Sequence, residues 1–286
     1  MILQSAGEHK ENAHFREALS LQRAFQSLGA DAVVIGPGYG DYLHDLDIWL
    51  GEVDAVLILE NYWRTPWLDF IRARVIEQGT HCALWSIDAH VPAAAARHLA
   101  LVREQHIPIV FCSTERTQEM FISAGAATAW LPNAYDHTLI GPRDAKNKYD
   151  AGFCGRMIAG RDAFFRGVSP TVRIDEWVLG EAMVQRVNEY RVHVNRSYSI
   201  DINYRCFETC GCRTALLTNR VPGIEKIFTD KEHCRYYNTA EECSIILRDM
   251  IAHPTDAELM AYRAYEHVRK NHTYLNRART IMERMR

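Results

Sequence analysis

A polar run in the C-terminal half of the sequence, VNRSYSIDINYRCFE over 194–208, holds the residue types best suited to chemistry. A strand is expected to end at Asn195 and a helix to begin near 201–203, so the run lies where a strand leads into a helix N-terminus. Free N–H groups there, with Arg205 beside them, suit the negative charge of a diphosphate. Glu208, one turn further, can accept hydrogen bonds from the two hydroxyls of a ribose. The residues expected to bind such a ligand are Asn195, Ser199, Asp201, Asn203, Tyr204, Arg205 and Glu208.

A purely structural interpretation of the same run is open. Asp201 or Asn203 can serve as the N-cap of the helix, since both residue types cap helices well. Capping alone does not account for Arg205 and Glu208 beside them, so we favour the ligand-binding interpretation.

The cysteines after this run offer a third interpretation, a zinc site. Cys206 and Cys210 share a helical face, but Cys212 is poorly placed as a third ligand on the same helix. No fourth Cys or His lies at a usual zinc spacing. The acidic triplet DLD at 45–47 falls inside an expected helix and is set aside as a metal motif. We therefore expect no bound metal, and small buried thiols where the helix meets the sheet.

A second turn with arginines, GFCGRMIAGR over 152–161, follows another expected strand. Gly155, Arg156 and Arg161 would place two guanidinium groups where a turn faces phosphates. The alternative is an ordinary turn between a strand and a helix, because a single glycine turn is weak evidence for a phosphate site. We expect these three residues to join the set that binds the diphosphate.

In the N-terminal half, a carboxylate and an imidazole follow a buried strand in LWSIDAH, 84–90. Asp88 and His90 lie where an open α/β sheet exposes catalytic side chains, and together they can serve general base catalysis. The alternative makes Asp88 a cap for the helix expected from Pro92. His9 and His14 lie in the polar loop after the first strand, at the same edge. Asp88, His90 and His9 are the catalytic candidates, with His14 next.

Strand and helix patterns alternate along the chain, which is typical of parallel sheets covered by helices. In the first half, strands are expected at 1–4, 31–38, 53–60, 81–88, 107–113 and 127–132, and helices at 14–29, 66–79, 92–105 and 114–125. In the second half, strands are expected at 149–155, 191–195, 214–219 and 234–238, and helices near 161–167 and at 203–212, 223–228, 240–254 and 255–271; no element is assigned within 170–190.

These patterns predict two domains. The polar segment 135–148 contains Gly-Pro and shows no periodicity, so it is expected to link domain 1–134 to domain 149–286, whose terminal helix returns towards the first. The predicted fold class is α/β, with two Rossmann-like doubly wound domains facing a central cleft. Ligands in such sheets bind beyond the carboxyl ends of the strands.

The overall composition is that of a folded domain protein. Of the 286 residues, 48% are hydrophobic and 24% are charged, and no apolar run reaches the length of a membrane span. The N-terminus turns polar after four residues, which predicts no secretory signal, a cytoplasmic location and reduced cysteines. The net charge of −3 gives no global attraction for nucleic acid, but the basic segment 262–286, with Arg269, Lys270 and Arg277, keeps a local contact open.

The motifs together resemble the CgeB-like group of glycosyltransferases, which have the GT-B fold. The segments that carry the resemblance are GPGYG, WSIDAH, WLPNAYD, YDAGFCG, VHVNRSYSIDINYRCFETCGCRTALLTN and NHTYLNR. The resemblance implies sugar transfer from a nucleotide diphosphate sugar without a bound metal. It implies that Asn203, Arg205 and Glu208 hold the donor, with Glu208 on the ribose. The glutamate pair of retaining enzymes is not present, since Asp201 and Ile200 precede Glu208 by seven and eight positions.

The expected function is therefore transfer of a sugar from a nucleotide sugar, a UDP-sugar by preference, to a hydroxyl acceptor. The nucleotide sugar is a co-substrate, and no resident cofactor is expected. The acceptor is a saccharide, an envelope glycan or a protein; a hydroxymethylated base in DNA, as for phage enzymes, is the alternative. A nucleotide-sugar epimerase and a non-catalytic nucleotide-sugar-binding protein are the remaining classes. The residues indicate no oligomeric state.

Overall fold

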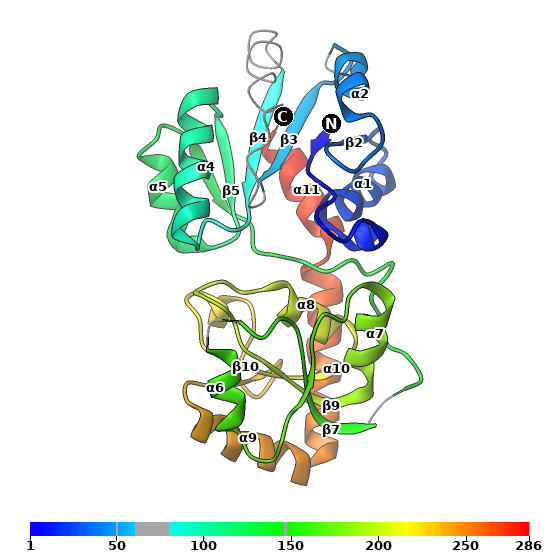
Figure 1. Cartoon of the computed structure of the whole chain (residues 1–286), viewed down its shortest axis with the longest axis vertical. Coiled ribbons are helices and arrows are strands. Elements are labelled where there is room, and N and C mark those ends of the chain that lie inside the picture. Colours follow the sequence, from blue (N-terminus) through cyan, green and yellow to red (C-terminus); the bar gives the residue numbers. More distant parts are fainter. Residues whose placement is uncertain (50, 61–79, 146–147, 159, 286) are drawn as a thin grey trace. The chain divides into compact units, whose positions relative to one another are not determined.

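The structure, a computed structural model, describes the chain except for residues 50, 61–79, 146–147, 159 and 286 (Figure 1). The helix expected over 66–79 lies outside the described residues. The chain divides into two compact units. The N-terminal unit comprises Met1–Pro132 and Tyr274–Arg286, and the C-terminal unit comprises Asn133–Thr273.

The N-terminal unit contains a six-stranded parallel sheet in the order β2-β1-β3-β4-β5-β6. Its strands are β1 Ile2–Leu3, β2 Val34–Ile35, β3 Ala55–Glu60, β4 His81–Ser86, β5 Ile109–Cys112 and β6 Ala127–Trp130. Its described helices are η1 Lys10–Phe15, α1 Glu17–Ser27, α2 Tyr42–Trp49, α4 Pro92–Gln105, η3 Glu115–Thr117, α5 Gln118–Ile122 and α11 Tyr274–Arg284.

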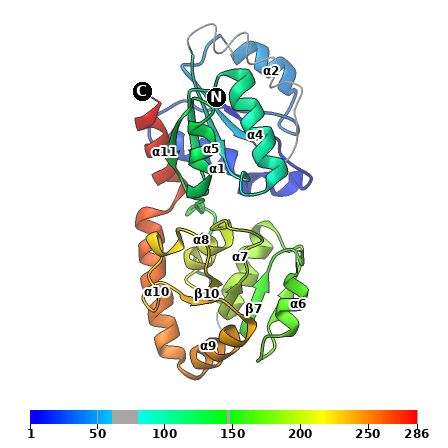
Figure 2. The same ribbon diagram turned by 90° about the vertical axis from the view of Figure 1, so that its left-hand side faces the viewer.

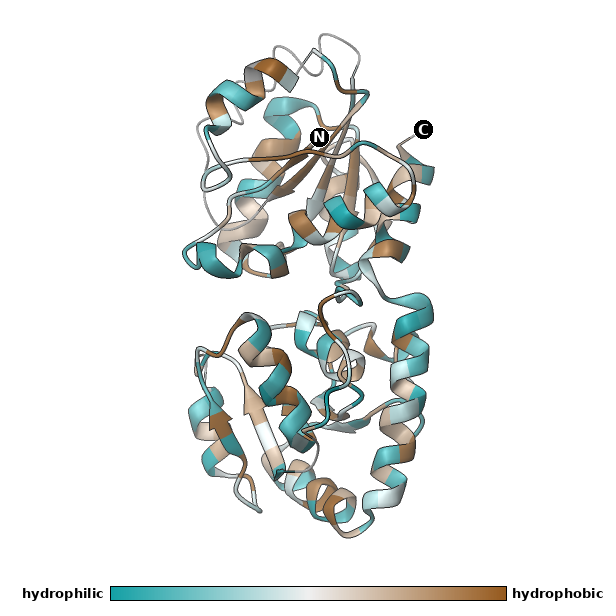
Figure 3. Cartoon of the chain, turned by 90° about the vertical axis from the view of Figure 1, so that its right-hand side faces the viewer, coloured by the Kyte–Doolittle hydropathy of each residue, from teal (hydrophilic) through white to brown (hydrophobic). Residues whose placement is uncertain are grey.

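The two faces of this sheet are covered by different helices because successive strand residues point to opposite sides. Leu84 of β4 packs in a core cluster with Val102 of α4 and Phe121 of α5. Its neighbour Trp85 points the other way and contacts Tyr274 of α11, with ring centroids 6.3 Å apart. Figure 3 shows the apolar character of the strands against the mixed character of the helices. Helix α11, at the end of the chain, thus completes the N-terminal unit.

The C-terminal unit contains a five-stranded parallel sheet in the order β11-β10-β9-β7-β8. Its strands are β7 Tyr149–Cys154, β8 Arg173–Asp175, β9 Tyr190–Asn195, β10 Ala215–Asn219 and β11 Arg235–Tyr237. Its described helices are α6 Arg161–Arg166, α7 Gly180–Glu189, α8 Tyr204–Gly211, η4 Ile224–Lys226, α9 Ala240–Ala252 and α10 Pro254–Asn271. The segment 170–190, which received no element from the sequence, forms β8 and α7.

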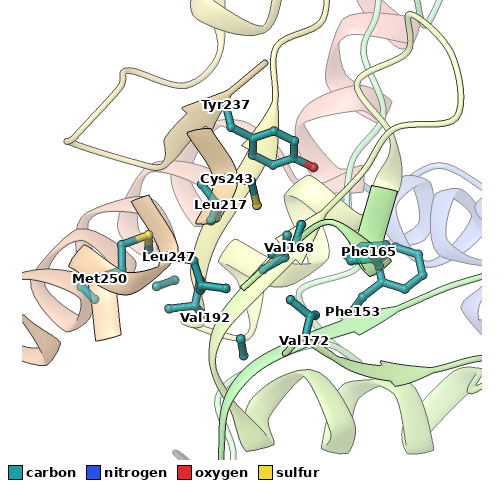
Figure 4. Packing of buried hydrophobic residues seen from close by; sticks show 14 of the residues in the cluster. Phe153, Phe165, Val168, Val172, Val192, Leu217, Tyr237, Cys243, Leu247 and Met250 are labelled. Carbon is teal, nitrogen blue, oxygen red and sulfur yellow. The ribbon is translucent and has the colours of Figure 1, made fainter. Parts of the chain in front are cut away.

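Helices also cover both faces of the second sheet. Phe153, Val192 and Leu217, from three neighbouring strands, pack with Phe165 of α6 and Leu247 of α9 (Figure 4). Helix α10 contributes Ala257, Met260 and Ala261 to the same cluster, and Figure 2 shows it running along this unit. The sheet also contacts α7 and α8, and His193 of β9, on the opposite face, contacts Thr209 of α8. Burial of each large apolar side chain in this core stabilises the fold by about 1.5–3 kcal/mol. The two parallel α/β sheets confirm the expected Rossmann-like architecture.

The segment 135–148 is not a separate linker, because it is part of the C-terminal unit. Tyr135 is 1% exposed and pairs with Thr273 in an isolated parallel bridge. A Cβ atom on Gly211 would lie 2.5 Å from the Tyr135 ring, so that helix residue has to be glycine. Because the segment is mostly polar, its composition did not predict that Tyr135 is buried.

The topological switch point of the C-terminal unit lies between β7 and β9. The chain runs from β7 to its neighbour β8, then crosses to β9 on the other side of β7. The carboxyl ends of β7 and β9 therefore lead into loops that diverge, and ligands of open α/β sheets bind at such points. Both arginine-bearing segments identified in the sequence follow these two strands.

Candidate functional site

Arg161 joins the two loops at the switch point. Its Nη1 donates to the backbone oxygen of Arg156 at 2.7 Å, after β7, and its Nε donates to the backbone oxygen of Arg196 at 2.9 Å, after β9. The Arg161 residue is 9% exposed and its guanidinium lies 5.3 Å from the Phe153 ring centroid. Burial lowers its pKa, and the nearby Asp201 carboxylate acts in the opposite direction. Arg161 thus fixes the positions of two further arginines while keeping its own charge.

Those two arginines are each supported by an aromatic ring. The guanidinium of Arg156 lies 4.6 Å from the Trp177 ring centroid, and that of Arg196 lies 4.8 Å from the Phe164 ring centroid. Such cation–π contacts restrict the side chains. Two carboxylates, Asp201 and Glu176, lie near the three arginines of this region, and Glu176 Oε1 accepts a hydrogen bond from the Met157 N–H at 2.9 Å. The net charge of the region is therefore positive and favours an anion.

Asn203 is the N-cap residue of α8, as one of the sequence alternatives allowed, but its side chain makes no capping hydrogen bond. Its amide instead donates to Asn195 Oδ1 at 3.3 Å and to Ser197 Oγ at 3.4 Å. The Ser197 N–H in turn donates to Asn219 Oδ1 at 2.7 Å. The side chain of Asn203 therefore holds the loop after β9 in place rather than capping the helix. Ser199 and Tyr204 lie within and just after this loop and are half-buried.

Glu208 and Arg205 form an ion pair on α8, with Nη1 and Oε2 2.8 Å apart. The side chain of Glu208 is 17% exposed and that of Arg205 is 18% exposed. Burial is the largest single effect and opposes the charge on Arg205, but Glu208, together with smaller contributions from nearby cysteine and tyrosine side chains, raises the pKa of Arg205. The pair presents a carboxylate whose orientation is fixed by its neighbour, one turn into the helix that starts at the switch point.

The N-terminal unit places Asp88 and His90 in the turn between β4 and α4. The Val91 N–H donates to the Asp88 backbone oxygen at 2.9 Å, and the N-cap residue of α4 is Val91 itself. Asp88 is therefore not the N-cap of that helix, which removes one structural alternative for it. The turn is anchored from β5, because the N–H of Ser113 donates to the Ser86 oxygen at 3.1 Å and its hydroxyl donates to the Ile87 oxygen.

His9 and His14 belong to the segment after β1, at the same carboxyl edge of the sheet, with β3 lying between β1 and β4. His9 is the N-cap of η1 and forms an exposed pair with Glu11, with Nδ1 and Oε1 3.3 Å apart. His14 lies inside η1 and contacts the Phe15 ring, with ring centroids 4.5 Å apart. The catalytic candidates thus lie at one edge of the sheet, but they follow β1 and β4, which are not adjacent strands.

Two buried histidines near these edges escaped the sequence analysis. His98 of α4 contacts the Ser86 hydroxyl through Nδ1 at 2.7 Å, and burial lowers the pKa of His98 to about 3. His193 of β9 accepts a hydrogen bond from the Cys154 N–H at 3.1 Å and contacts Thr209 Oγ1 at 2.6 Å. Their only sequence signal is an ionisable residue inside an apolar pattern, as in RVHVN.

The cysteines are all free and buried. Cys206 lies between α8 and the sheet, where Asn195 Nδ2 approaches its sulfur at 3.3 Å, and burial raises the pKa of its thiol. Within the described parts of the chain, no three His, Cys, Asp or Glu side chains form a group that could hold a metal ion. The DLD triplet lies in α2, as expected.

Arg277, counted with the exposed basic residues from the sequence, is buried. It is 5% exposed, its Nε donates to the Pro132 oxygen at 2.7 Å, and burial lowers its pKa to about 10. It shares the inner face of α11 with Tyr274 and Ile281, one turn away on either side. It therefore anchors α11 and is removed from the candidate nucleic-acid contacts.

None of the helices in the described ranges combines the length and apolar character needed to cross a membrane.

Solved structures similar to this chain extend over its whole length. HepE of Anabaena in complex with UDP-glucose has a TM-score of 0.73 at 12% identity, covering 99% of this chain and 98% of that one. T4 phage BGT in complex with UDP and Mn²⁺ has a TM-score of 0.65 at 12% identity, with coverage of 99% and 98%. An alpha-glucosyltransferase in complex with UDP and a 13-mer DNA containing an HMU base has a TM-score of 0.67 at 10% identity, with coverage of 99% and 98%. These similarities confirm the GT-B fold.

A family model places the chain more specifically. Comparison of the sequence with curated proteins gave no match. The model described as glycosyl transferase-like matches residues 116–283, which are more than half of the sequence and include the whole switch point. The chain belongs to the glycosyl transferase-like family.

Proposed function

We propose that this protein transfers a sugar from a UDP-sugar to a hydroxyl acceptor, with the donor bound at the switch point of the C-terminal unit. The observation that carries the proposal is the Arg161 side chain, which donates to the backbone oxygens of Arg156 after β7 and Arg196 after β9 and so joins the two loops that carry these arginines. The similarity to HepE in its complex with UDP-glucose supports a uridine nucleotide. We also propose that the chain falls within the CgeB-like group.

The donor would be held in two parts. Its diphosphate would lie against Arg156, Arg161 and Arg196 and the N-terminus of α8, where N–H groups and the helix dipole favour negative charge. Its ribose would hydrogen-bond to Glu208, whose orientation Arg205 fixes. Gly155, Asn195, Ser199, Asp201, Asn203 and Tyr204 would shape the loops around it.

Departure of UDP builds negative charge on the phosphates as the sugar leaves. Guanidinium groups fixed before the reaction can stabilise that charge without reorganising, as preorganised donors do elsewhere. We therefore propose metal-independent transfer. T4 phage BGT has been crystallised with Mn²⁺, so the proposal has to be tested directly.

The acceptor hydroxyl must lose a proton as the new bond forms. We propose Asp88 as the group that takes it, with His90 beside it in the same turn and His9 at the same sheet edge. A neutral acceptor such as a saccharide is favoured, because the net charge is −3 and Arg277 is buried. A modified base in DNA is the second candidate, on the similarity to the enzyme solved with DNA.

The proposal is tested with a panel of nucleotide sugars in thermal unfolding. A donor at about 100 times its dissociation constant stabilises the folded protein by about 2.7 kcal/mol, and a UDP-sugar should produce this shift with EDTA present. UDP release on adding acceptor then separates a transferase from an epimerase or a binding protein. A shift with other nucleotides only, or one that requires metal, would contradict the assignment.

Glu189→Gln provides a matched control for the ribose assignment. Glu189 pairs with Arg186 on α7 at 2.9 Å, with the same three-residue spacing as Glu208 and Arg205. Glu208→Gln should reduce the UDP-induced shift, whereas Glu189→Gln should leave it unchanged. Equal effects of the two variants would show that the loss is one of general stability.

A further inference from the structure

The main-chain pairing between β7 and β9 stops before either strand ends. The two strands are in register from Tyr149 with Tyr190 to Gly152 with His193. Beyond that point they separate, while β7 continues to pair with β8, where the Gly155 N–H donates to the Asp175 oxygen at 3.2 Å. The Cys154 N–H, directed to the β9 side, donates instead to the imidazole Nε2 of His193 at 3.1 Å. A side chain thus replaces the main-chain acceptor where the strands diverge.

This bond determines the tautomer of His193. A backbone N–H can only donate, so Nε2 must be the unprotonated nitrogen and the proton of the neutral ring lies on Nδ1. Nδ1 then donates to Thr209 Oγ1, 2.6 Å away on α8. One imidazole therefore joins the end of β7, the body of β9 and the helix that carries Glu208.

The surroundings keep this bridge in one state. His193 is 0% exposed and lies against the rings of Tyr190 and Phe153, with centroids 5.8 Å and 6.4 Å away. Burial, with the nearby charge of Arg205, lowers the pKa of His193 well below its ordinary value. The ring therefore remains neutral throughout the pH range in which most proteins are folded, and both of its hydrogen bonds persist.

We propose that His193 is a positioning residue that fixes the Gly155–Arg156 turn relative to Glu208, so that phosphate and ribose contacts are correctly spaced. The inference rests on the proposed donor site. It follows from the sequence of contacts: Cys154 directly precedes the turn, and Thr209 directly follows Glu208. A change at the imidazole would displace both halves of the donor site together.

Thr209→Val and Thr209→Ser test the bridge without altering the histidine. Valine keeps the shape of threonine but removes the acceptor, so the affinity for UDP should fall about tenfold, the worth of one net hydrogen bond. Serine keeps the hydroxyl and should bind UDP within about twofold of the parent. Exchange of the Cys154 amide should become faster in Thr209→Val only, because that N–H loses its oriented acceptor.

Thr214→Val is the matched control. Its hydroxyl is buried in the same unit and donates to the Val187 oxygen at 2.9 Å, away from the loops of the switch point. It should lose stability like Thr209→Val yet bind UDP like the parent. Loss of UDP affinity in Thr214→Val equal to that in Thr209→Val would overturn the proposal, since any buried hydroxyl would then have the same effect.

The tautomer can be measured in the unmodified protein. Nitrogen-15 NMR of labelled histidine should show His193 protonated at Nδ1 between about pH 5 and 9, the range over which a buried neutral histidine does not titrate. Protonation at Nε2, or titration in that range, would overturn the bridge even if Thr209→Val does not fold. A parent protein that fails to bind UDP would overturn the donor site; a parent that binds UDP, with Thr209→Val unaffected, would overturn only the role of His193.

Discussion

The two units of this molecule each contain a buried histidine near a proposed site, His98 in the N-terminal unit and His193 in the C-terminal unit, and the two differ in their hydrogen bonds. Both lie near the carboxyl edge of a parallel sheet, both contact a buried hydroxyl, and burial lowers the pKa of each. His193 uses both ring nitrogens, whereas Nε2 of His98 has no hydrogen-bond partner within the described residues. The imidazole beneath the proposed donor site is hydrogen-bonded at both nitrogens, and the one beneath the Asp88 turn is hydrogen-bonded at one. The orientation of the His193 ring is therefore fixed from two sides, whereas that of the His98 ring is fixed from one.

Replacing each histidine by leucine should give the largest measurable difference between His193 and His98, in the free energy of unfolding. His193→Leu leaves the Cys154 N–H and the Thr209 hydroxyl without their partner, which should lower the free energy of unfolding by about 3 kcal/mol. His98→Leu leaves only Ser86 and removes an unpartnered nitrogen, so the loss should be about 1 kcal/mol or less. Urea denaturation measures both values. Equal losses would mean that the difference between the networks has no energetic consequence.

Asp88→Asn tests the catalytic side of the comparison. The amide keeps the shape of the carboxylate but cannot accept the acceptor's proton, so transfer should fall about 100-fold or more while UDP affinity is unchanged. Single-turnover transfer and UDP titration measure the two properties separately. Asp54→Asn is the control, since Asp54 precedes β3 at the opposite edge of the same sheet. Normal transfer by Asp88→Asn would show that Asp88 is not the base, and His90 and His9 would be tested next.

Glu208→Gln tests the donor side. Loss of a charged acceptor for the ribose hydroxyls should weaken UDP binding about tenfold, at the lower end of what a hydrogen bond to a charged group contributes. Calorimetric titration measures the affinity directly. Unaltered affinity in a folded Glu208→Gln protein would show that Glu208 does not bind the ribose.

The pH dependence of stability gives the smallest effect. Burial alone would raise the pKa of Asp175, but hydrogen bonds from Arg173 and Tyr190, at 2.7 Å and 2.6 Å, outweigh it and hold the pKa below the ordinary value of 3.8. The stabilisation from the Asp175 carboxylate is therefore fully present above pH 3.8 and is lost as the pH falls through the lower folded-state value.

Asp175→Asn should consequently flatten the acid limb of the stability curve, measured by urea denaturation from about pH 5 downwards. The neutral and alkaline parts of the curve should keep their shape in this variant. A parent and variant with parallel acid limbs would show that Asp175 titrates normally in the folded protein.

The sequence predicts the sheets well and their side-chain contacts poorly. Alternating apolar strands and amphipathic helices follow from local periodicity, so most described elements coincide with the expected ones. The run at 194–208 was identified because a polar segment between a strand and a helix is unusual in a core. The contacts of Asn203 could not be predicted, because whether an asparagine caps its helix or bonds a loop depends on where Asn195 and Ser197 lie in space.

Three other residues show why long-range packing overrides composition. Tyr135 stands in a polar segment, yet it packs against Gly211, which lies far from it in the sequence. Arg277 belongs to a basic segment, but the positions of Tyr274 and Ile281 place it on the buried face of α11. That spacing is visible in the sequence and could have identified Arg277 as internal. No comparable signal links His193 to Cys154 and Thr209, since the link exists only where β7 and β9 diverge.

Hydrogen–deuterium exchange with and without saturating UDP tests the central claim most directly, because it reports where the nucleotide binds on the intact protein. The account predicts slower exchange of the amides at 154–161 and 196–205, the two loops that Arg161 joins, together with the start of α8. The N-terminal turn at 87–91 should exchange as before, since UDP alone lacks the acceptor. Protection of 87–91 with no change at 154–161 and 196–205 would contradict the assignment of the donor site to the C-terminal unit.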